Sequence, residues 1–227
     1  MNNKIRLFAL AAISTLMFAF PAVAAAGEPV MDPASGKFPL TFTLAGKHVE
    51  IRGAGEPSIT CTASSGSGKY STGTTGELNL TFQGCSTEFF GFPVSCNSNG
   101  QASGTVKTAT TVFHDTYLTD AKTTPGILIT PPTSEVITTI ICSSFANVEI
   151  IGNGIIGHFE SPQCGTSSKT RTLNFTATAA SQTFKQVTGT GTVFEPLYRT
   201  EGRTSVTGAL VAEMTVTFSE NATLTCV

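Results

Sequence analysis

A strict alternation of apolar and polar residues is the feature that most constrains the fold of this chain. In LVAEMTVTFSE (210–220) every second residue from Leu210 to Phe218 is apolar, and from Ala212 onward these alternate with Glu213, Thr215 and Thr217. GELNLTFQ (76–83) and TLNFTAT (172–178) alternate in the same way. Because successive side chains of a strand point to opposite faces of a sheet, this period of two predicts strands with one apolar face and one polar, threonine-rich face.

Two other segments are more continuously apolar and predict central strands. They are EVITTIIC (135–142) and NVEIIGNGIIGHF (147–159), the second with GNG (152–154) as a hairpin turn. Glycine and proline interrupt the chain between strands, and no long helical periodicity is present. The pattern therefore predicts an all-β fold, an antiparallel Greek-key β-sandwich of about 10–12 strands, with a β-barrel as the alternative.

The N-terminus has the layout of a secretory signal peptide. Lys4 and Arg6 precede an apolar run, LFALAAISTLMFAFPAVA (7–24), and small residues follow it. A membrane anchor is the rival interpretation, but Pro21 and the alanines after it favour cleavage. We expect a signal peptide at 1–26, a flexible leader at 27–36 and a single all-β domain at 37–227. No later run is long and apolar enough to predict a transmembrane segment in the mature chain.

Charge and cysteine content narrow the partners and the compartment. Charged residues make up 12% of the chain and its net charge is −2, so nothing indicates a nucleic-acid partner. An even number of cysteines in an exported chain predicts three disulfides. No C-x-x-C pair occurs and the histidines are scattered, so we expect neither a metal site nor a cofactor. The six cysteines are Cys61, Cys85, Cys96, Cys142, Cys164 and Cys226.

The pairing of the cysteines is less constrained than their oxidation, because six cysteines allow 15 connectivities. The firmest prediction is Cys85–Cys96, which would close CSTEFFGFPVSC between two strands. Cys142–Cys164 and Cys61–Cys226 would then complete a nested set. In a meander of 135–142, 146–152 and 155–161 the outer strands lie about 9–10 Å apart, beyond the reach of a disulfide, so these two pairings stay open. In either case Cys226 should fasten the last strand.

No segment predicts catalysis. GNGIIG (152–157) matches a dinucleotide-binding pattern, but the residues after it are not helical. SSGSGKYST (64–72) lacks the spacing of a phosphate-binding loop and is typical of a turn between strands. His114 and Asp115 are adjacent, but no nucleophile motif accompanies them, so we interpret them as polar residues at a strand end. No catalytic residue is assigned, and a hydrolase built from distant carboxylates remains the alternative.

One segment could form a binding surface. STEFFGFPVS (86–95) places Phe89, Phe90 and Phe92 in one short loop, and apolar clusters on rigid loops mark contact sites. The opposing interpretation is that these rings fold back and cap the core. A chain with no Trp and three Tyr is poorly suited to binding sugars. We therefore expect a secreted extracellular or cell-surface module with a non-enzymatic binding or structural role. Its partner is unknown, with a protein or a cell-surface component as the options, and an inhibitor presenting the Cys85–Cys96 loop is a further alternative.

The chain also resembles a family of uncharacterised secreted, six-cysteine, β-rich proteins of soil actinobacteria. The likeness rests on turn and cysteine patterns and runs from about residue 45 to the end. The segments that carry it are SITCTASSGSGKYSTGTTGELNLTFQGC, PGILITP, VEIIGNGIIGHFESPQCG, QVTGTGT and the final TLTC. The resemblance implies export, disulfides and β structure, and it implies no activity, ligand or functional residue.

Overall fold

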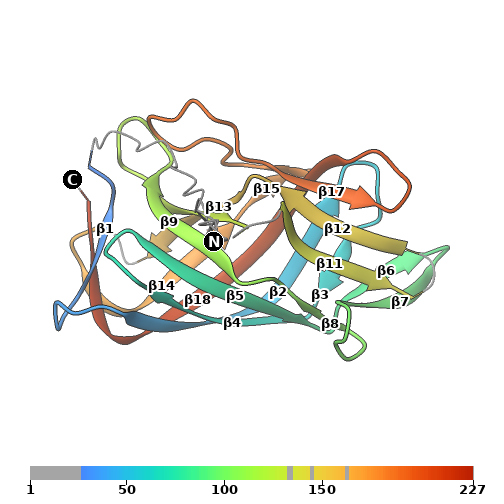
Figure 1. Ribbon diagram of the computed structural model, residues 1–227, viewed down its shortest axis with the longest axis horizontal. Coiled ribbons are helices and arrows are strands. Elements are labelled where there is room, and N and C mark those ends of the chain that lie inside the picture. Colours follow the sequence, from blue (N-terminus) through green and yellow to red (C-terminus); the bar gives the residue numbers. More distant parts are fainter. Residues whose placement is uncertain (1–26, 132–134, 144–145, 162–163, 227) are drawn as a thin grey trace, which may run out of the picture.

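The regular secondary structure of the described residues consists of β-strands, without a helix. The computed structural model describes residues 27–131, 135–143, 146–161 and 164–226. Eighteen strands run through these residues, and every pairing between them is antiparallel (Figure 1). The predicted all-β, antiparallel fold is confirmed. The predicted signal peptide, 1–26, lies outside the described residues.

Most of the strands continue one another along eight longer extended segments, which we call strand paths. Two paths, the first and the last, are single unbroken strands, and six are interrupted. In chain order the paths are β2 (Leu40–Gly53); β3 (Ile59–Cys61) with β4 (Ala63–Tyr70); β5 (Thr75–Gln83) with β6 (Ser86–Phe89); β7 (Phe92–Asn97) with β8 (Thr105–Lys107) and β9 (Thr111–Tyr117); β10 (Pro125–Thr130) with β11 (Val136–Cys142); β12 (Ala146–Gly152) with β13 (Ile155–Ser161); β14 (Ser167–Phe175) with β17 (Pro196–Thr200); and β18 (Val206–Thr225).

Each strand path pairs with the next one along the chain, and the last pairs with the first. The closing pair is β18 with β2, in register from Gly208↔Gly53 to Phe218↔Phe42. The order of the strands is therefore a meander that returns to its start, simpler than the predicted Greek key, because short connections keep sequence neighbours side by side. In Figure 1 the ring is flattened, with β2 and β4 on one wall and β11 and β12 on the other. The apolar faces of both walls meet inside.

Three local predictions were wrong. SSGSGKYST (64–72), expected as a turn, lies mostly within the strand β4. The flexible leader predicted at 27–36 contains β1 (Val30–Pro33), which pairs with the end of β18 and buries Met31 completely. GNG (152–154) is not a hairpin turn. β12 pairs with β11 and β17, whereas β13 pairs with β10 and β14, so GNG interrupts one strand path that continues in the same direction. A glycine-rich break and a glycine-rich turn have the same local sequence, and only the pairing separates them.

The alternating residues face as predicted. Leu78, Leu80 and Phe82 are buried, and the alternating apolar residues from Leu210 to Phe218 are buried with them in one large core. Part of this core is a cluster of four aromatic rings whose centroids lie 4.7–6.3 Å apart. The rings are those of Phe42, Tyr70, Phe113 and Phe218.

Two glycines let the backbone approach this cluster. A Cβ on Gly76 would lie 2.4 Å from the ring of Phe113, and one on Gly68 would lie 2.4 Å from the ring of Phe42. Both distances are shorter than non-bonded carbon atoms tolerate, and a backbone carbonyl oxygen also lies within 2.1 Å of the first Cβ position and 2.5 Å of the second. The glycines therefore let the two rings lie against the walls of the flattened ring of strands.

A second, small core lies outside the ring of strands. Between β14 and β17 the chain leaves the wall, forms the hairpin of β15 (Ala177–Thr178) and β16 (Ser181–Gln182), and packs over β10 and β13. Leu128 and Ile156 point outward under this excursion and are buried against Val187. The cover explains why these two segments are apolar on both faces, whereas other strands alternate.

Candidate functional site

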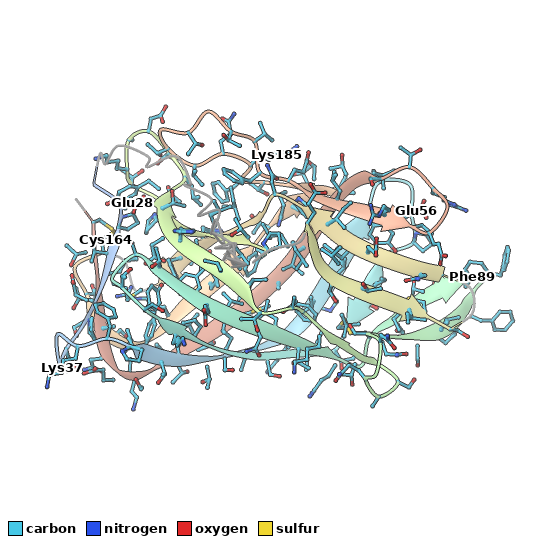
Figure 2. All side chains as sticks on the ribbon, viewed as in Figure 1. Glu28, Lys37, Glu56, Phe89, Cys164 and Lys185 are labelled. Carbon is cyan, nitrogen blue, oxygen red and sulfur yellow. A yellow bond between two sulfur atoms is a disulfide. The ribbon has the colours of Figure 1, made fainter. Side chains whose placement is uncertain are left out.

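The β6–β7 hairpin protrudes from the ring and carries the three predicted phenylalanines. Its strands pair from Ser86↔Ser95 to Phe89↔Phe92, and two residues, Phe90 and Gly91, form the turn. Figures 1 and 2 show the hairpin, with Phe89, at one end of the long axis of the molecule. The hairpin thus presents its turn beyond the ring of strands.

The aromatic side chains at this turn face solvent. Phe90 is 89% exposed and Phe92 is 73% exposed, the highest values among the large apolar side chains of the described residues. Phe89 is half-buried, and its ring meets that of Phe90 edge to face with centroids 4.7 Å apart. The interpretation in which these rings cap the core is wrong for Phe90 and Phe92. We call residues 88–93 the hairpin tip.

The backbone of the tip is also costly. Phe90 has φ of 50° and Gly91 has φ of 81°, the combination of a two-residue type I′ turn. Asn or Gly is preferred at the first of these positions, whereas a bulky side chain with positive φ costs about 1–2 kcal/mol. Phe90 therefore lowers stability in two ways, through its backbone conformation and through the exposure of its apolar ring to solvent. Such a residue points to a role outside the stability of the fold.

The disulfides differ from the predicted set. All six cysteines are oxidised, but the pairs are Cys61–Cys85, Cys96–Cys142 and Cys164–Cys226. The predicted Cys85–Cys96, Cys142–Cys164 and Cys61–Cys226 bridges are wrong. Cys226 does fasten the end of the last strand, to the turn before β14, and Gly165 N–H donates to the Leu224 carbonyl beside it at 2.8 Å.

The register of the strands explains why the disulfides pair differently from the prediction. The first four cysteines lie in one row across neighbouring strands, in the order Cys61, Cys85, Cys96, Cys142. A Cys85–Cys96 bridge is sterically adjacent, since Cys96 N–H donates to the Cys85 carbonyl at 2.9 Å. It would leave the outer two cysteines three strand spacings apart, about 14 Å, which no disulfide spans. Only the observed pairing oxidises all four.

These two bridges hold the base of the hairpin. Cys85 lies immediately before β6 and is tied to β3, and Cys96 lies in β7 and is tied to β11. Both bridges are buried in the core. The exposed tip is therefore carried on a base that is cross-linked on each side, and a preorganised base lowers the entropic cost of contact.

The adjacent pair His114 and Asp115 does not form an acid–base site. The two side chains follow strand alternation to opposite faces of β9, so Asp115 is fully buried inside the ring and His114 is half-buried on the outside. Burial lowers the pKa of His114 below its usual value. The interpretation of the pair as polar residues at a strand end is thus wrong for Asp115.

Asp115 belongs to a buried polar cluster that the sequence did not reveal. The Tyr70 hydroxyl donates to Asp115 Oδ1 at 3.0 Å. Burial raises the pKa of Asp115 well above its usual value, and the Tyr70 hydrogen bond and the positive charge of Arg171 oppose this only in part. Arg171 is buried as well and donates to the carbonyls of Thr166 at 2.8 Å and Ala222 at 3.4 Å. Asp115 lies two residues after Phe113 and therefore on the same face of the strand, which is the sequence pattern that could have predicted its burial.

An enclosed cavity of about 40 Å³ lies inside the ring where several strand paths are interrupted. Its lining is apolar except for three threonines, and their hydroxyls bond to the backbone. Thr111 donates to the Leu78 carbonyl at 3.0 Å, Thr138 donates to the Lys107 carbonyl at 2.9 Å, and Thr108 accepts from Leu80 N–H at 3.0 Å. A space that admits only a few water-sized groups is a packing gap and not a substrate site.

The outer face of β5, β4, β2, β18 and β14 carries a shallow hollow of about 760 Å³. One row of small polar side chains crosses all five strands in direct register. The row is Thr170, Thr217, Thr43, Ser67 and Asn79. Strand alternation predicted this polar face. Its charged lining residues are Lys69, Glu77 and Lys169, of which Lys69 and Glu77 form an ion pair of 3.5 Å, and the open face does not gather groups for catalysis.

Within the part of the chain that the structure describes, no three His, Cys, Asp or Glu side chains are grouped so that they could hold a metal ion. The same residues include no helix with the length and apolar character needed to cross a membrane. Comparison with models of protein families, with curated proteins and with solved structures found no match to this chain.

Proposed function

We propose that this chain is a secreted, non-enzymatic module that makes contact with an extracellular or cell-surface partner through the hairpin tip. The observation that supports the proposal is the placement of Phe90. Its ring is 89% exposed, in a backbone conformation that disfavours it, on a hairpin whose base is cross-linked by two disulfides. Stability alone selects against such a residue, so contact with another surface is the better reason for its presence.

The proposal also fits the resemblance to secreted proteins of soil actinobacteria and the three disulfides, which persist in oxidising compartments. It differs in one respect from the alternative of an inhibitor that presents a Cys85–Cys96 loop. The presented segment is an open hairpin tied to its neighbours, and not a loop closed by its own disulfide.

Photocrosslinking in a culture of the producing cells tests the contact. A photoreactive phenylalanine analogue is placed at position 90 and, in a matched control, at position 193, where Val193 is 49% exposed on another part of the surface. We expect a crosslinked adduct from position 90 and none from position 193. No adduct at 90, or equal adducts at both positions, contradicts a contact role for the tip.

A further inference from the structure

The hairpin tip is too small to form a stable interface with a protein by itself. Protein interfaces typically bury about 800 Å² on each partner and involve about 20–30 residues a side. The tip comprises only residues 88–93, and its exposed large apolar side chains are Phe90 and Phe92. A partner that offers an apolar layer for a few side chains to enter, and not a wide complementary surface, fits so small a tip better.

The chemistry of the tip points the same way. Residues 89–93, FFGFP, contain no side chain that can form a hydrogen bond. Phe89 and Phe92 pair across the turn, and Pro93 has no N–H group to leave unsatisfied. Protein interfaces surround their apolar centre with polar groups that confer specificity. Residues 89–93 carry no such side chains, which suits them to an apolar environment.

The reach of the tip matches the depth of a lipid interface. Thr87 is the last residue of β6 that pairs with β3, and Cys96 is the first residue of β7 that pairs with β11. In β7, Val94 and Ser95 also lie beyond the pairing with β11, and Val94 is paired with Thr87. Beyond the Thr87↔Val94 pair the hairpin extends by two residues on each strand, Glu88–Phe89 and Phe92–Pro93, before and after the turn. At about 3.4 Å per residue this is about 7 Å, within the 5–10 Å by which interfacial segments enter a membrane.

The charge near the tip selects among lipid surfaces. Glu88 is the only charged residue among residues 85–98. Glu56, which lies toward the same end of the molecule in Figure 2, is paired with Arg203 at 3.0 Å. The tip therefore offers no basic patch that would attract anionic lipids.

We propose that the hairpin tip inserts Phe90 and Phe92 into the interface of an electrically neutral lipid surface. The inference rests on the proposed contact function and specifies its partner. Two phenylalanines provide weak, reversible anchoring, since even a single acyl chain gives an association constant only on the order of 10⁴ M⁻¹. The cross-linked base keeps both rings oriented before contact.

Vesicle binding tests the inference. Protein of residues 27–227 is sedimented with phosphatidylcholine vesicles, alone and in parallel with Phe90→Ser, Phe92→Ser and the control Val193→Ser. We expect each phenylalanine variant to lower the partition coefficient about tenfold or more, whereas the control leaves it unchanged. Replacing part of the phosphatidylcholine by phosphatidylserine should not strengthen binding, and raising the salt concentration should not weaken it.

The outcomes separate this inference from the function on which it rests. Wild-type protein that does not bind vesicles, or a control that loses as much binding as the tip variants, overturns the lipid inference. If position 90 nevertheless crosslinks to a protein on the producing cells, the contact function stands and its partner is a protein pocket. If neither binding nor crosslinking occurs, both proposals fail. Unchanged near-ultraviolet circular dichroism of each variant confirms that the substitutions leave the fold intact.

Discussion

At the scale of single residues, this chain retains side chains that oppose its own stability. Phe90 has a positive φ and an exposed ring, and Asp115 is a carboxyl group buried inside the ring of strands. Each of these two residues lowers the stability of the fold through its own conformation or environment. Their effects can therefore be measured by single substitutions.

Replacing Phe90 by Asn should stabilise the protein. Asn-Gly is the preferred pair for a type I′ turn, so Phe90→Asn relieves the backbone strain and removes an exposed ring. We expect a gain of about 1 kcal/mol in the free energy of unfolding, or about 2–4 °C in Tm. Thermal unfolding followed by circular dichroism measures it. A lower Tm for Phe90→Asn than for wild type would show that Phe90 contributes to the fold.

Asp115 should make stability depend on pH. Its pKa is raised in the folded state by burial, so the folded protein holds a proton that the unfolded chain releases above about pH 4. The corresponding stability is present below that pH and is lost as the pH rises toward the folded-state pKa. Asp115→Asn lacks this titration and can still accept the Tyr70 hydrogen bond.

The difference in unfolding free energy between Asp115→Asn and wild type should therefore shift in favour of the variant above about pH 4, by at most about 1.4 kcal/mol per pH unit. Urea unfolding at a series of pH values between about 3 and about 7 gives both curves. Parallel curves for the two proteins would mean that the buried carboxyl group does not keep its proton.

At the scale of elements, the β6–β7 hairpin depends on its two basal disulfides. Removing Cys96–Cys142 by a double Ala substitution should cost about 2–5 kcal/mol and release one side of the hairpin base. Hydrogen exchange should then accelerate at residues 86–97 more than in β18. The matched control is the double Ala variant at Cys164 and Cys226, which should instead accelerate exchange in β1 and the end of β18. Identical exchange patterns in the two variants would contradict local fastening.

Peptide mapping without reduction checks the pairing itself. A proteolytic fragment that contains Cys85 should be linked to one that contains Cys61, and a fragment with Cys96 to one with Cys142. Cleavage between Cys85 and Cys96, within the hairpin, is needed before digestion products can be assigned. Recovery of a Cys85–Cys96 link from the wild-type protein would overturn the arrangement in which neighbouring strands fasten the hairpin base.

At the scale of the whole molecule, the ring of strand paths closes through one pairing. β18 lies between β2 on one side and β14 with β17 on the other, so its central amides and carbonyls are bonded on both edges. We expect the slowest hydrogen exchange in the described chain at residues 210–218. The two-stranded β15–β16 hairpin should exchange early, since it pairs with no other strand. Comparable protection of both regions would mean that the ring does not unfold as a unit.

The sequence by itself determined the β character of the chain, the burial of its alternating residues, the oxidation of its cysteines and the aromatic content of the hairpin. The first two and the last follow from residues close together along the chain, and the oxidation of the cysteines follows from their even number. Only the tertiary structure decided which cysteines pair, that Asp115 meets Tyr70 and lies near Arg171, and that GNG continues a strand path. Those outcomes depend on register between distant strands, because a shift of one residue reverses every face and local periodicity does not specify the neighbouring strand.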